Sequence, residues 1–201
     1  MSETPFSESA PDIAHSASTR EHRAQAPHAV RCAVLTVSDT RTLETDRGGA
    51  LIEEHLREAG HEIVARQIVP DDVEAIRHKA LQVLGGDAER VDALIVTGGS
   101  GIGPRDVSPE ALRPLVTKEL PGFGEVFRVL SWEEVGAATM LSRAFAGVVE
   151  RHQNGKEACR SLLFVLPGST NAVRLAMEKL IVPELGHLVR EVSPQRASKG
   201  S

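Results

Sequence analysis

A glycine-rich segment directly after a buried apolar run is the part of this sequence best suited to chemistry. It spans Thr97–Gly103 and reads TGGSGIG. Glycines let the backbone turn several N–H groups toward one point, which suits a phosphate or pyrophosphate. The segment is not a P-loop, because no Gly-Lys-Ser/Thr follows, and Pro104–Val107 separates it from the next helix, unlike a dinucleotide fingerprint. The alternative interpretation is a mobile connection without a ligand.

Two acidic residues could bind a metal ion near such a ligand. Asp106 lies beside Arg105 and just ahead of a helix that is expected to take Ser108 as its N-cap. The Asp106 carboxylate is then available for Mg²⁺, which prefers one or two carboxylates together with phosphate oxygens, although a surface ion pair with Arg105 is the alternative. Asp71 is more ambiguous, because its spacing to Glu74 also fits a helix cap. The two roles of Asp71 are compatible.

Other polar residues at loop positions have both a structural and a functional interpretation. Asp39 follows the first apolar run, where an Asx-type turn would account for it, and Asp46 has a similar alternative. Arg128 and Arg143 could each pair with an anion or remain solvated. Ser142 has no base beside it in the sequence that would make it a nucleophile.

The elements that position these residues alternate between strands and helices. The apolar patterns predict strands at Arg31–Val37, His61–Val69 and Asp92–Thr97, with helices at Gly48–Ala59 and Asp71–Leu84. This alternation indicates a parallel sheet with helices on both faces. In such a sheet, ligands bind beyond the carboxyl ends of the strands, where the strand order reverses. The loops that carry polar and glycine residues leave these strand ends.

The second half of the chain adds an antiparallel hairpin to the predicted sheet. Apolar segments at Ala144–Glu150 and Arg160–Leu166 flank an Asn-Gly pair, which is a strong hairpin signal. Helical stretches are expected around Glu125–Val135 and over Thr170–Leu185. The fold class is therefore α/β, with a mostly parallel sheet that gains an antiparallel pair.

Composition and charge restrict the class of protein. The 201 residues suffice for one α/β domain, and the formal net charge of −5 argues against a nucleic-acid-binding protein. No apolar run reaches about 18 residues, and the N-terminus lacks a secretion pattern, so we expect a cytoplasmic protein that does not span a membrane. Residues 1–29 are rich in small and polar residues and are expected to be a disordered tail, residues 30–192 one domain, and residues 193–201 a frayed C-terminus.

Five ordered segments of this chain resemble the MoaB/MogA family of molybdenum cofactor biosynthesis proteins. They are AVLTVSDT at 33–40, TGGSGIGPRDVSPEAL at 97–112, PGFGEVFR at 121–128, MLSRAFAG at 140–147 and FVLPGST at 164–170. The run GFGEVFRVLSWEEVG looks especially like the B-type members. One departure is visible: Ser100 stands where the family usually has Thr in TGGTG, and it keeps the hydroxyl group.

The resemblance implies a fold, an activity and partners. It implies a three-layer α/β/α fold, assembly as a homotrimer or homohexamer, and binding of molybdopterin. It also implies transfer of AMP from ATP to the terminal phosphate of molybdopterin, with Mg²⁺, with no tightly bound prosthetic group, and with the next molybdenum-insertion enzyme as a possible partner. A molybdopterin-binding or carrier protein that does not consume ATP is the alternative.

The resemblance also assigns site residues. The acidic positions associated with magnesium and catalysis fall on Asp71 and Asp106. The remaining positions hold phosphates or line the pterin and nucleotide pocket, and they fall on Ser38, Asp39, Gly98, Gly99, Ser100, Gly101, Ser142, Arg143, Pro167, Gly168 and Ser169.

Overall fold

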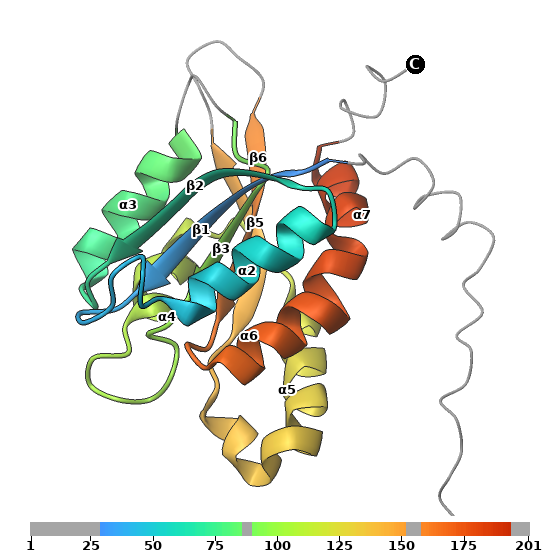
Figure 1. Ribbon diagram of the computed structural model, residues 1–201. Helices are drawn as coiled ribbons and strands as arrows, with labels where there is room; N and C mark the ends of the chain where they lie inside the picture. The colour runs from blue at the N-terminus through green and yellow to red at the C-terminus, as the bar shows by residue number, and fades with distance from the viewer. Residues whose placement is uncertain (1–28, 86–89, 152–157, 194–201) are drawn as a thin grey trace, which may run out of the picture.

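The computed structural model describes residues 29–85, 90–151 and 158–193, which form a mixed six-stranded sheet between two layers of helices (Figure 1). Apart from Ala29 and Ser193, the predicted tail and frayed C-terminus lie outside the described residues, as does the Asn-Gly pair of the hairpin. The three-layer α/β/α prediction is confirmed.

The sheet has the order β2-β1-β3-β6-β5-β4. Its parallel part consists of β2 (Glu62–Val69), β1 (Arg31–Val37), β3 (Ala93–Thr97) and β6 (Cys159–Leu166). The strands β5 (Phe145–Arg151) and β4 (Lys118–Glu119) complete it, with β5 antiparallel to both neighbours. The hairpin of β5 and β6 was predicted from the sequence. The two-residue strand β4 was not, because so short an edge carries no alternation of apolar residues.

The parallel strands end together at one edge of the sheet. Val37 is in register with Val69, and Thr97 is in register with both Thr36 and Leu166. The chain passes from β1 to β2 on one side and returns to β3 on the other, so the strand order reverses between β1 and β3. The loops that carry the predicted site therefore leave the sheet at the place where α/β proteins bind ligands.

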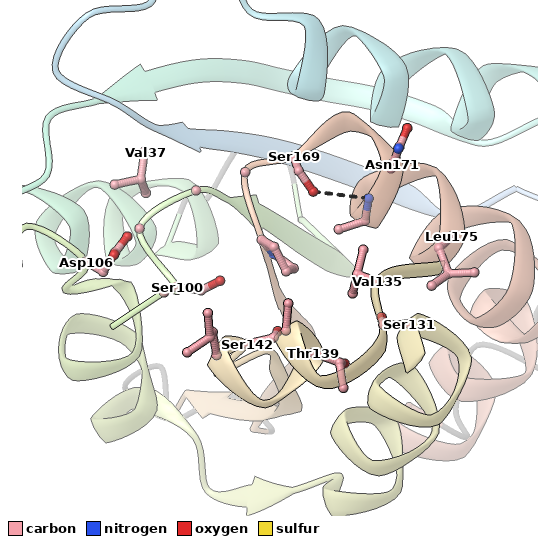
Figure 2. Close-up of a pocket in the computed structure, with 18 of the residues that line it drawn as sticks. Val37, Ser100, Asp106, Ser131, Val135, Thr139, Ser142, Ser169, Asn171 and Leu175 are labelled. Carbon is pink, nitrogen blue, oxygen red and sulfur yellow. Dashed lines mark hydrogen bonds between the residues drawn. The ribbon is translucent and has the colours of Figure 1, made fainter. Parts of the chain in front are cut away.

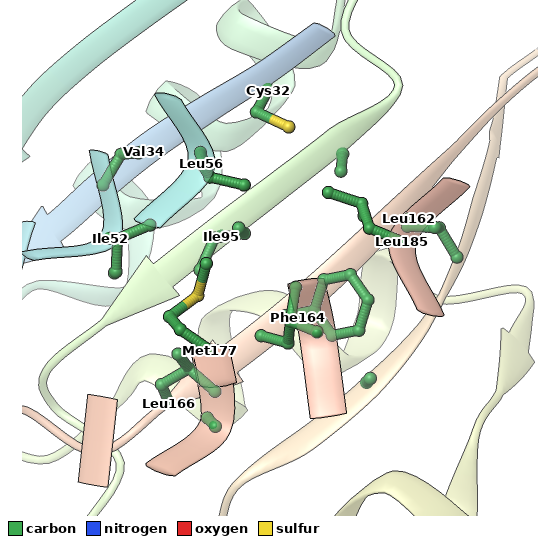
Figure 3. Close-up of a cluster of buried hydrophobic side chains, with 14 of the residues drawn as sticks. Cys32, Val34, Ile52, Leu56, Ile95, Leu162, Phe164, Leu166, Met177 and Leu185 are labelled. Carbon is green, nitrogen blue, oxygen red and sulfur yellow. The ribbon is translucent and has the colours of Figure 1, made fainter. Parts of the chain in front are cut away.

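Two clusters of buried side chains hold the helices on the sheet. One cluster joins the sheet to α2 (Arg47–Glu58), α5 (Pro121–Val135), α6 (Thr170–Ala176) and α7 (Val182–Val192). Figure 3 shows its centre, where Ile95 and Phe164 of the sheet lie near Ile52, Leu56 and Met177 of the helices. The second cluster packs α3 (Val73–Gly85) and α4 (Ser108–Leu112) on the opposite face. Branched aliphatic residues make up most of both clusters.

The remaining helical segments are short. A 3-10 turn, η1 (Arg113–Leu115), follows α4, and a second, η2 (Gly136–Leu141), follows α5. A π-helical turn, η3 (Met177–Ile181), joins α6 to α7, so the last helical region runs to Val192, beyond the predicted end at Leu185. No helix of the described residues is long and apolar enough to cross a bilayer.

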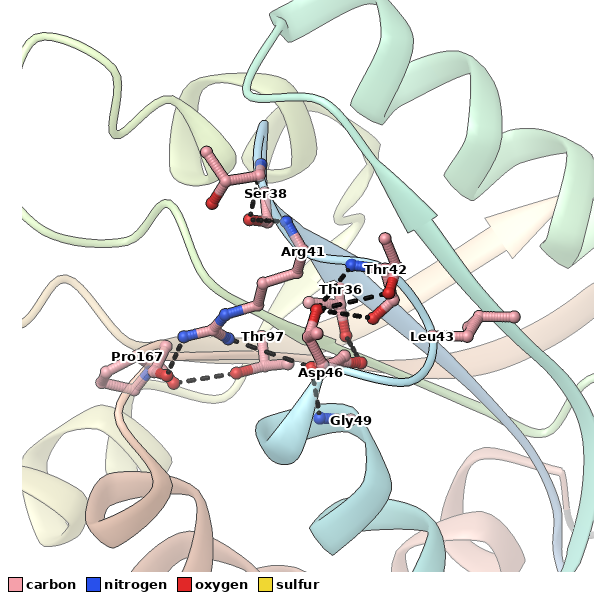
Figure 4. A network of polar contacts seen from close by, with 12 residues as sticks. Thr36, Ser38, Arg41, Thr42, Leu43, Asp46, Gly49, Thr97 and Pro167 are labelled. Atoms are coloured by element: carbon pink, nitrogen blue, oxygen red, sulfur yellow. Dashed lines mark hydrogen bonds and ion pairs between the residues drawn. The ribbon is translucent and has the colours of Figure 1, made fainter.

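A buried carboxylate fixes the start of α2 against the sheet. Asp46 is 1% exposed and caps α2 by accepting a hydrogen bond of 2.9 Å from the Gly49 N–H. Its other oxygen accepts 2.7 Å from the Thr36 hydroxyl of β1 (Figure 4). The same oxygen lies 3.2 Å from the Arg66 guanidinium of β2. Asp46 therefore ties two strands and one helix together. This confirms its structural interpretation.

We expect Gly49→Ala to destabilise the fold through this contact. A Cβ on Gly49 would lie 2.1 Å from Asp46 Oδ2 and 2.7 Å from Thr36 Oγ1, so the buried hydrogen bonds would have to shift. The free energy of unfolding should fall by roughly 2 kcal/mol or more, as for other overpacked sites. Gly48→Ala is the matched control, because its Cβ would meet nothing closer than 3.7 Å. Equal stability of the two variants in urea denaturation would contradict the prediction.

Candidate functional site

A cavity of about 600 Å³ opens at the carboxyl edge of the sheet. Eleven of the thirteen predicted site residues line it: Ser38, Asp71, Gly98, Gly99, Ser100, Gly101, Asp106, Ser142, Pro167, Gly168 and Ser169. They come from loops after all four parallel strands and from the segment that follows η2. The two others, Asp39 and Arg143, lie next to the lining and do not contribute to it. The cavity is large enough for a ligand of drug size.

The floor of the cavity is the glycine-rich loop, packed against neighbouring backbone. Gly98 and Gly99 have φ values of 99° and 62°, in the region that favours glycine. A Cβ on Gly98 would lie 2.3 Å from the Val37 carbonyl oxygen, and one on Gly168 would lie 3.3 Å from the Gly98 Cα. The loop after β6 therefore passes close to the loop after β3. Only glycine fits at Gly98.

Ser108 has a different role from the helix cap predicted for it. Its side chain makes no capping hydrogen bond, and Val107 occupies the N-cap position of α4. Instead the buried Ser108 hydroxyl donates 2.8 Å to the Gly98 carbonyl, and its N–H donates 2.9 Å to the Gly99 carbonyl. The cap prediction was wrong because the nearest backbone acceptor comes from the glycine loop, a tertiary contact.

Arg143 holds the glycine-rich loop from behind. Its backbone N–H donates 3.1 Å to the Ser100 carbonyl, Nε donates 2.7 Å to the Gly101 carbonyl, and Nη2 donates 2.6 Å to the Asp106 carbonyl. Nη1 pairs with Glu110. The side chain faces a second cavity, which Arg113 and Arg128 also line. In this arrangement Arg143 positions the loop from outside the first cavity.

Ser100 brings an unsatisfied hydroxyl group to the first cavity. The residue is 2% exposed, and its Oγ has no hydrogen-bond partner among the described residues. A buried polar group without a partner costs about 1–3 kcal/mol, so such groups are rare and call for an explanation. Figure 2 shows Ser100 on the same wall as Ser142, which also lines the cavity. A ligand oxygen at this wall would satisfy the hydroxyl.

Asp71 is free for a ligand because its neighbour caps the helix. The Asp72 carboxylate accepts 2.8 Å from the Ala75 N–H at the start of α3, so the cap predicted for Asp71 belongs to Asp72. Burial raises the pKa of the Asp71 carboxyl, and the charges of Asp39 and Asp106 raise it further. The Asp71 carboxyl is thus partly desolvated, and it lies near the negative charge of Asp39.

Asp39 and Asp106 have structural partners of their own. Asp39 pairs with Arg105, and this hydrogen bond, followed by one from the Asp71 N–H at 3.1 Å, lowers the pKa of the Asp39 carboxyl. Asp106 Oδ2 accepts 2.8 Å from the Gly103 N–H. The sequence analysis considered an ion pair between Arg105 and Asp106, but in the structure Arg105 pairs with Asp39. Asp106 helps to close its own loop while still lining the cavity.

The acidic side chains fit a magnesium ion that is shared with phosphate oxygens. A Cβ on Gly99 would lie 3.1 Å from Asp71 Oδ1, and one on Gly101 would lie 2.8 Å from Asp106 Oδ2, so both carboxylates flank the glycine loop. Among the described residues, no group of three or more His, Cys, Asp or Glu side chains could hold a metal ion. Two carboxylates beside a phosphate-binding loop match the usual donors of Mg²⁺.

The other half of the cavity comes from residues that the sequence interpretation missed. Phe127, Ser131, Val135 and Thr139 line it from α5 and η2, and Phe127 is fixed by Phe123, whose ring stacks on it with centroids 6.3 Å apart. The helical pattern of α5 was recognisable, but nothing in its spacing indicated that its C-terminal end would face the loops. Apolar walls with a few hydroxyl groups suit a planar heterocycle.

Arg41 was also missed. It lies in the loop after β1, between two acidic residues that were considered, and it lines the cavity. Its guanidinium is 3.9 Å from Asp46 Oδ1, and it donates a hydrogen bond of 3.4 Å to the Gly168 carbonyl (Figure 4). The feature of the sequence that could have identified Arg41 is a basic residue in a loop at the end of a strand.

Comparisons with known proteins agree with this geometry. A domain family described as "Probable molybdopterin binding domain" matches residues 33–187. The molybdenum cofactor biosynthesis protein B of Bacillus subtilis (strain 168) is 50% identical over 176 residues, covering 87% of this chain and 97% of that protein. The protein of the same name from Staphylococcus carnosus (strain TM300) is 53% identical over 167 residues, covering 82% and 91%.

Solved structures show the same relationship. A crystal structure of a molybdenum cofactor biosynthesis protein B superposes with a TM-score of 0.76 at 46% identity, covering 85% of this chain and 99% of that one. The tungsten cofactor synthesizing protein MoaB from Pyrococcus furiosus gives 0.69 at 39% identity, covering 83% and 99%. The sheet, the cavity and these similarities together establish that the chain belongs to the MoaB/MogA family of molybdenum cofactor biosynthesis proteins.

Proposed function

We propose that this protein binds molybdopterin in the cavity at the carboxyl edge of the sheet and transfers AMP from MgATP to its terminal phosphate. The observation that carries the proposal is the Ser100 hydroxyl, which is buried at the cavity wall without a partner among the described residues. A role in molybdenum cofactor biosynthesis follows from the named relatives. Adenylyl transfer is the more specific activity that we propose within this role.

Three features of the cavity support a reaction between two phosphate-bearing substrates. The glycine-rich loop offers backbone N–H groups for phosphate oxygens. Asp71 and Asp106 lie on either side of this loop and suit a metal-bound polyphosphate. The wall from α5 and η2 suits a heterocycle. These features support binding of a ring and of two phosphate groups that lie close enough to react.

The reaction requires positioning and charge neutralisation. An oxygen of the terminal phosphate of molybdopterin forms a new bond to the α-phosphorus of ATP, the bond from this phosphorus to the α–β bridging oxygen breaks, and pyrophosphate leaves. Little covalent chemistry is left for the protein, as in other phosphoryl transfers. Bound Mg²⁺ would neutralise charge on the phosphate chain. Arg143 and Ser108 keep the loop N–H groups preorganised, which is how fixed dipoles contribute to catalysis.

We expect Asp71→Asn and Asp106→Asn each to fold and yet lose adenylyl transfer by on the order of 10²-fold or more, as for other lost transition-state contacts. Asp71 makes no capping bond, and the amide oxygen introduced by Asp106→Asn can still accept from the Gly103 N–H. Molybdopterin affinity should largely survive, because the apolar wall is intact. AMP transfer, molybdopterin affinity and melting temperature are measured in saturating Mg²⁺.

Asp72→Asn is the matched control for these variants. It removes the adjacent carboxylate, which caps α3 and does not line the cavity, and Asn is an equally good cap. Full adenylyl transfer by both Asp71→Asn and Asp106→Asn would contradict the metal-site assignment and favour the carrier function without ATP turnover. A shared loss of stability and activity would show that the carboxylates are structural.

The raised pKa of Asp71 predicts a gain in stability for the Asn variant. A carboxyl whose pKa is higher in the folded than in the unfolded protein destabilises the fold once the pH exceeds the unfolded value of about 3.9. Asp71→Asn removes this cost, so without ligands it should melt above wild type at pH 7. The difference should shrink as the pH approaches 4. Melting curves that show a gap widening toward acid would refute this explanation.

We also expect a homotrimer or homohexamer, as the family resemblance implies. Among the described residues, α5 and η2 expose apolar side chains, including Val129 and Met140 at 68% and 74% and Trp132 at 60%. Light scattering should give a mass of three or six chains. Val129→Glu should weaken the assembly, whereas Leu81→Glu, at an exposed apolar site on α3, should not. A monomer at micromolar concentration would overturn the expectation.

The proposal retains the cytoplasmic location and the partner expected from the sequence. The adenylated product would pass to the next molybdenum-insertion enzyme. Both remain predictions.

A further inference from the structure

The charges that line the first cavity are unevenly distributed. Of its described lining residues, Asp71, Asp106 and Glu134 are acidic, and Arg41 is the single basic residue. A substrate with phosphate groups adds negative charge to a cavity that is already acidic. A bound metal ion would relieve this at Asp71 and Asp106, but the phosphate of the second substrate, which does not ligate the metal, needs a cation from the protein.

The contacts of Arg41 are long enough to be exchanged for a ligand. Its Nη1 lies 3.9 Å from Asp46 Oδ1, and its Nη2 donates 3.4 Å to the Gly168 carbonyl. Charge-assisted hydrogen bonds between an arginine and an anion are usually about 2.7–2.9 Å long. The side chain is 37% exposed. Its guanidinium therefore keeps most of its hydrogen-bonding capacity.

Asp46 does not depend on Arg41 for neutralisation. The Arg66 guanidinium lies 3.2 Å from Asp46 Oδ2 and is itself only 17% exposed. The Thr36 hydroxyl and the Gly49 N–H complete the shell of the carboxylate at 2.7 Å and 2.9 Å. A turn of Arg41 toward the cavity would leave Asp46 paired and hydrogen-bonded.

The backbone N–H of Arg41 is fixed by a hydrogen bond, whereas its guanidinium makes only the two long contacts given above. The Arg41 N–H donates 3.2 Å to the Ser38 hydroxyl oxygen, and the Ser38 N–H donates 2.9 Å to the Val69 carbonyl at the end of β2. The loop is thereby anchored at the switch point of the sheet. An anchored arginine whose planar fork makes only long contacts is well suited to two oxygens of one phosphate.

The other arginines near the loop are engaged elsewhere. Arg105 pairs with Asp39 and does not line the cavity, and Arg143 donates to the carbonyls of Gly101 and Asp106. We propose that Arg41 binds a phosphate monoester of the substrate directly, without a metal ion, beside the loop after β6. The metal-bound polyphosphate would lie beside it, near Asp71 and Asp106, so that the monoester can reach the α-phosphorus of ATP. This assignment rests on the proposed function, since it divides two phosphate ligands between two places in one cavity.

Binding of inorganic phosphate in EDTA tests the metal-free site. Full-length wild type, Arg41→Gln, Arg41→Lys and Arg47→Gln are titrated with phosphate by ³¹P NMR and, separately, with ATP in saturating Mg²⁺ by calorimetry. Arg47 is the matched control, because it is an exposed arginine on the same segment that does not line the cavity. Circular dichroism and melting temperature verify that each variant is folded.

We expect wild type and Arg47→Gln to bind phosphate without metal, and Arg41→Gln to bind it about tenfold more weakly or worse, in keeping with a lost hydrogen bond to a charged group. Arg41→Lys should lie between, because it keeps the charge and loses the fork. The affinity for MgATP should change by less than about twofold in all variants.

Three outcomes would overturn the assignment. They are equal phosphate binding by wild type and Arg41→Gln, no phosphate binding by wild type in EDTA, and a loss confined to MgATP. Failure of the proposed function has a different signature. Wild type would then neither bind MgATP nor transfer AMP, while its phosphate binding would still depend on Arg41.

Discussion

The close approach of glycine backbone at the ends of β1, β3 and β6 is the constraint on which the site depends. Gly98 passes so near the Val37 carbonyl that a Cβ would be only 2.3 Å away, and a Cβ on Gly168 would make a tight contact of 3.3 Å with the Gly98 Cα. With side chains here, the three loops would separate and the cavity floor would open. The Ser108 hydroxyl and the Arg143 guanidinium hold the loop in this compressed arrangement. The N–H groups are therefore fixed before any ligand arrives.

The same arrangement leaves polar groups at the cavity in positions that lower the stability of the folded protein. Partial burial, and after it the charge of Asp39, raises the pKa of the Asp71 carboxyl. The Ser100 hydroxyl is buried without a partner among the described residues. Stability is reduced by both features, and both would be relieved by a bound cation and phosphate. Sites that bind ligands commonly retain such strain, because the ligand completes the interactions that the protein leaves open.

Membership of the family supports conclusions only about the parts of the fold that the relatives share with this chain. Sequence identity near 50% with proteins of molybdenum cofactor biosynthesis covers 87% and 82% of this chain. It supports a common cavity and a common role. We propose that adenylyl transfer depends on a few side chains, above all Asp71 and Asp106, with Arg41 as a phosphate ligand. A binding protein and an adenylyltransferase could share every strand and differ only there.

The sequence by itself determined the α/β class, three of the parallel strands, the hairpin and the glycine-rich loop, because these follow from local patterns of apolar residues and glycines. The parallel pairing of β6 with β3 was decided by the tertiary structure. The sequence also identified eleven residues that line one cavity. It misassigned Ser108 and Asp71 as caps, since local spacing could not show that Ser108 would meet Gly98 or that Asp72 would cap α3. Only the tertiary structure showed that Arg41 and the wall from α5 and η2 line the same cavity. These residues are distant in sequence, and their chemistry depends on the cavity they share, which exists only once the strands have paired and the helices have packed.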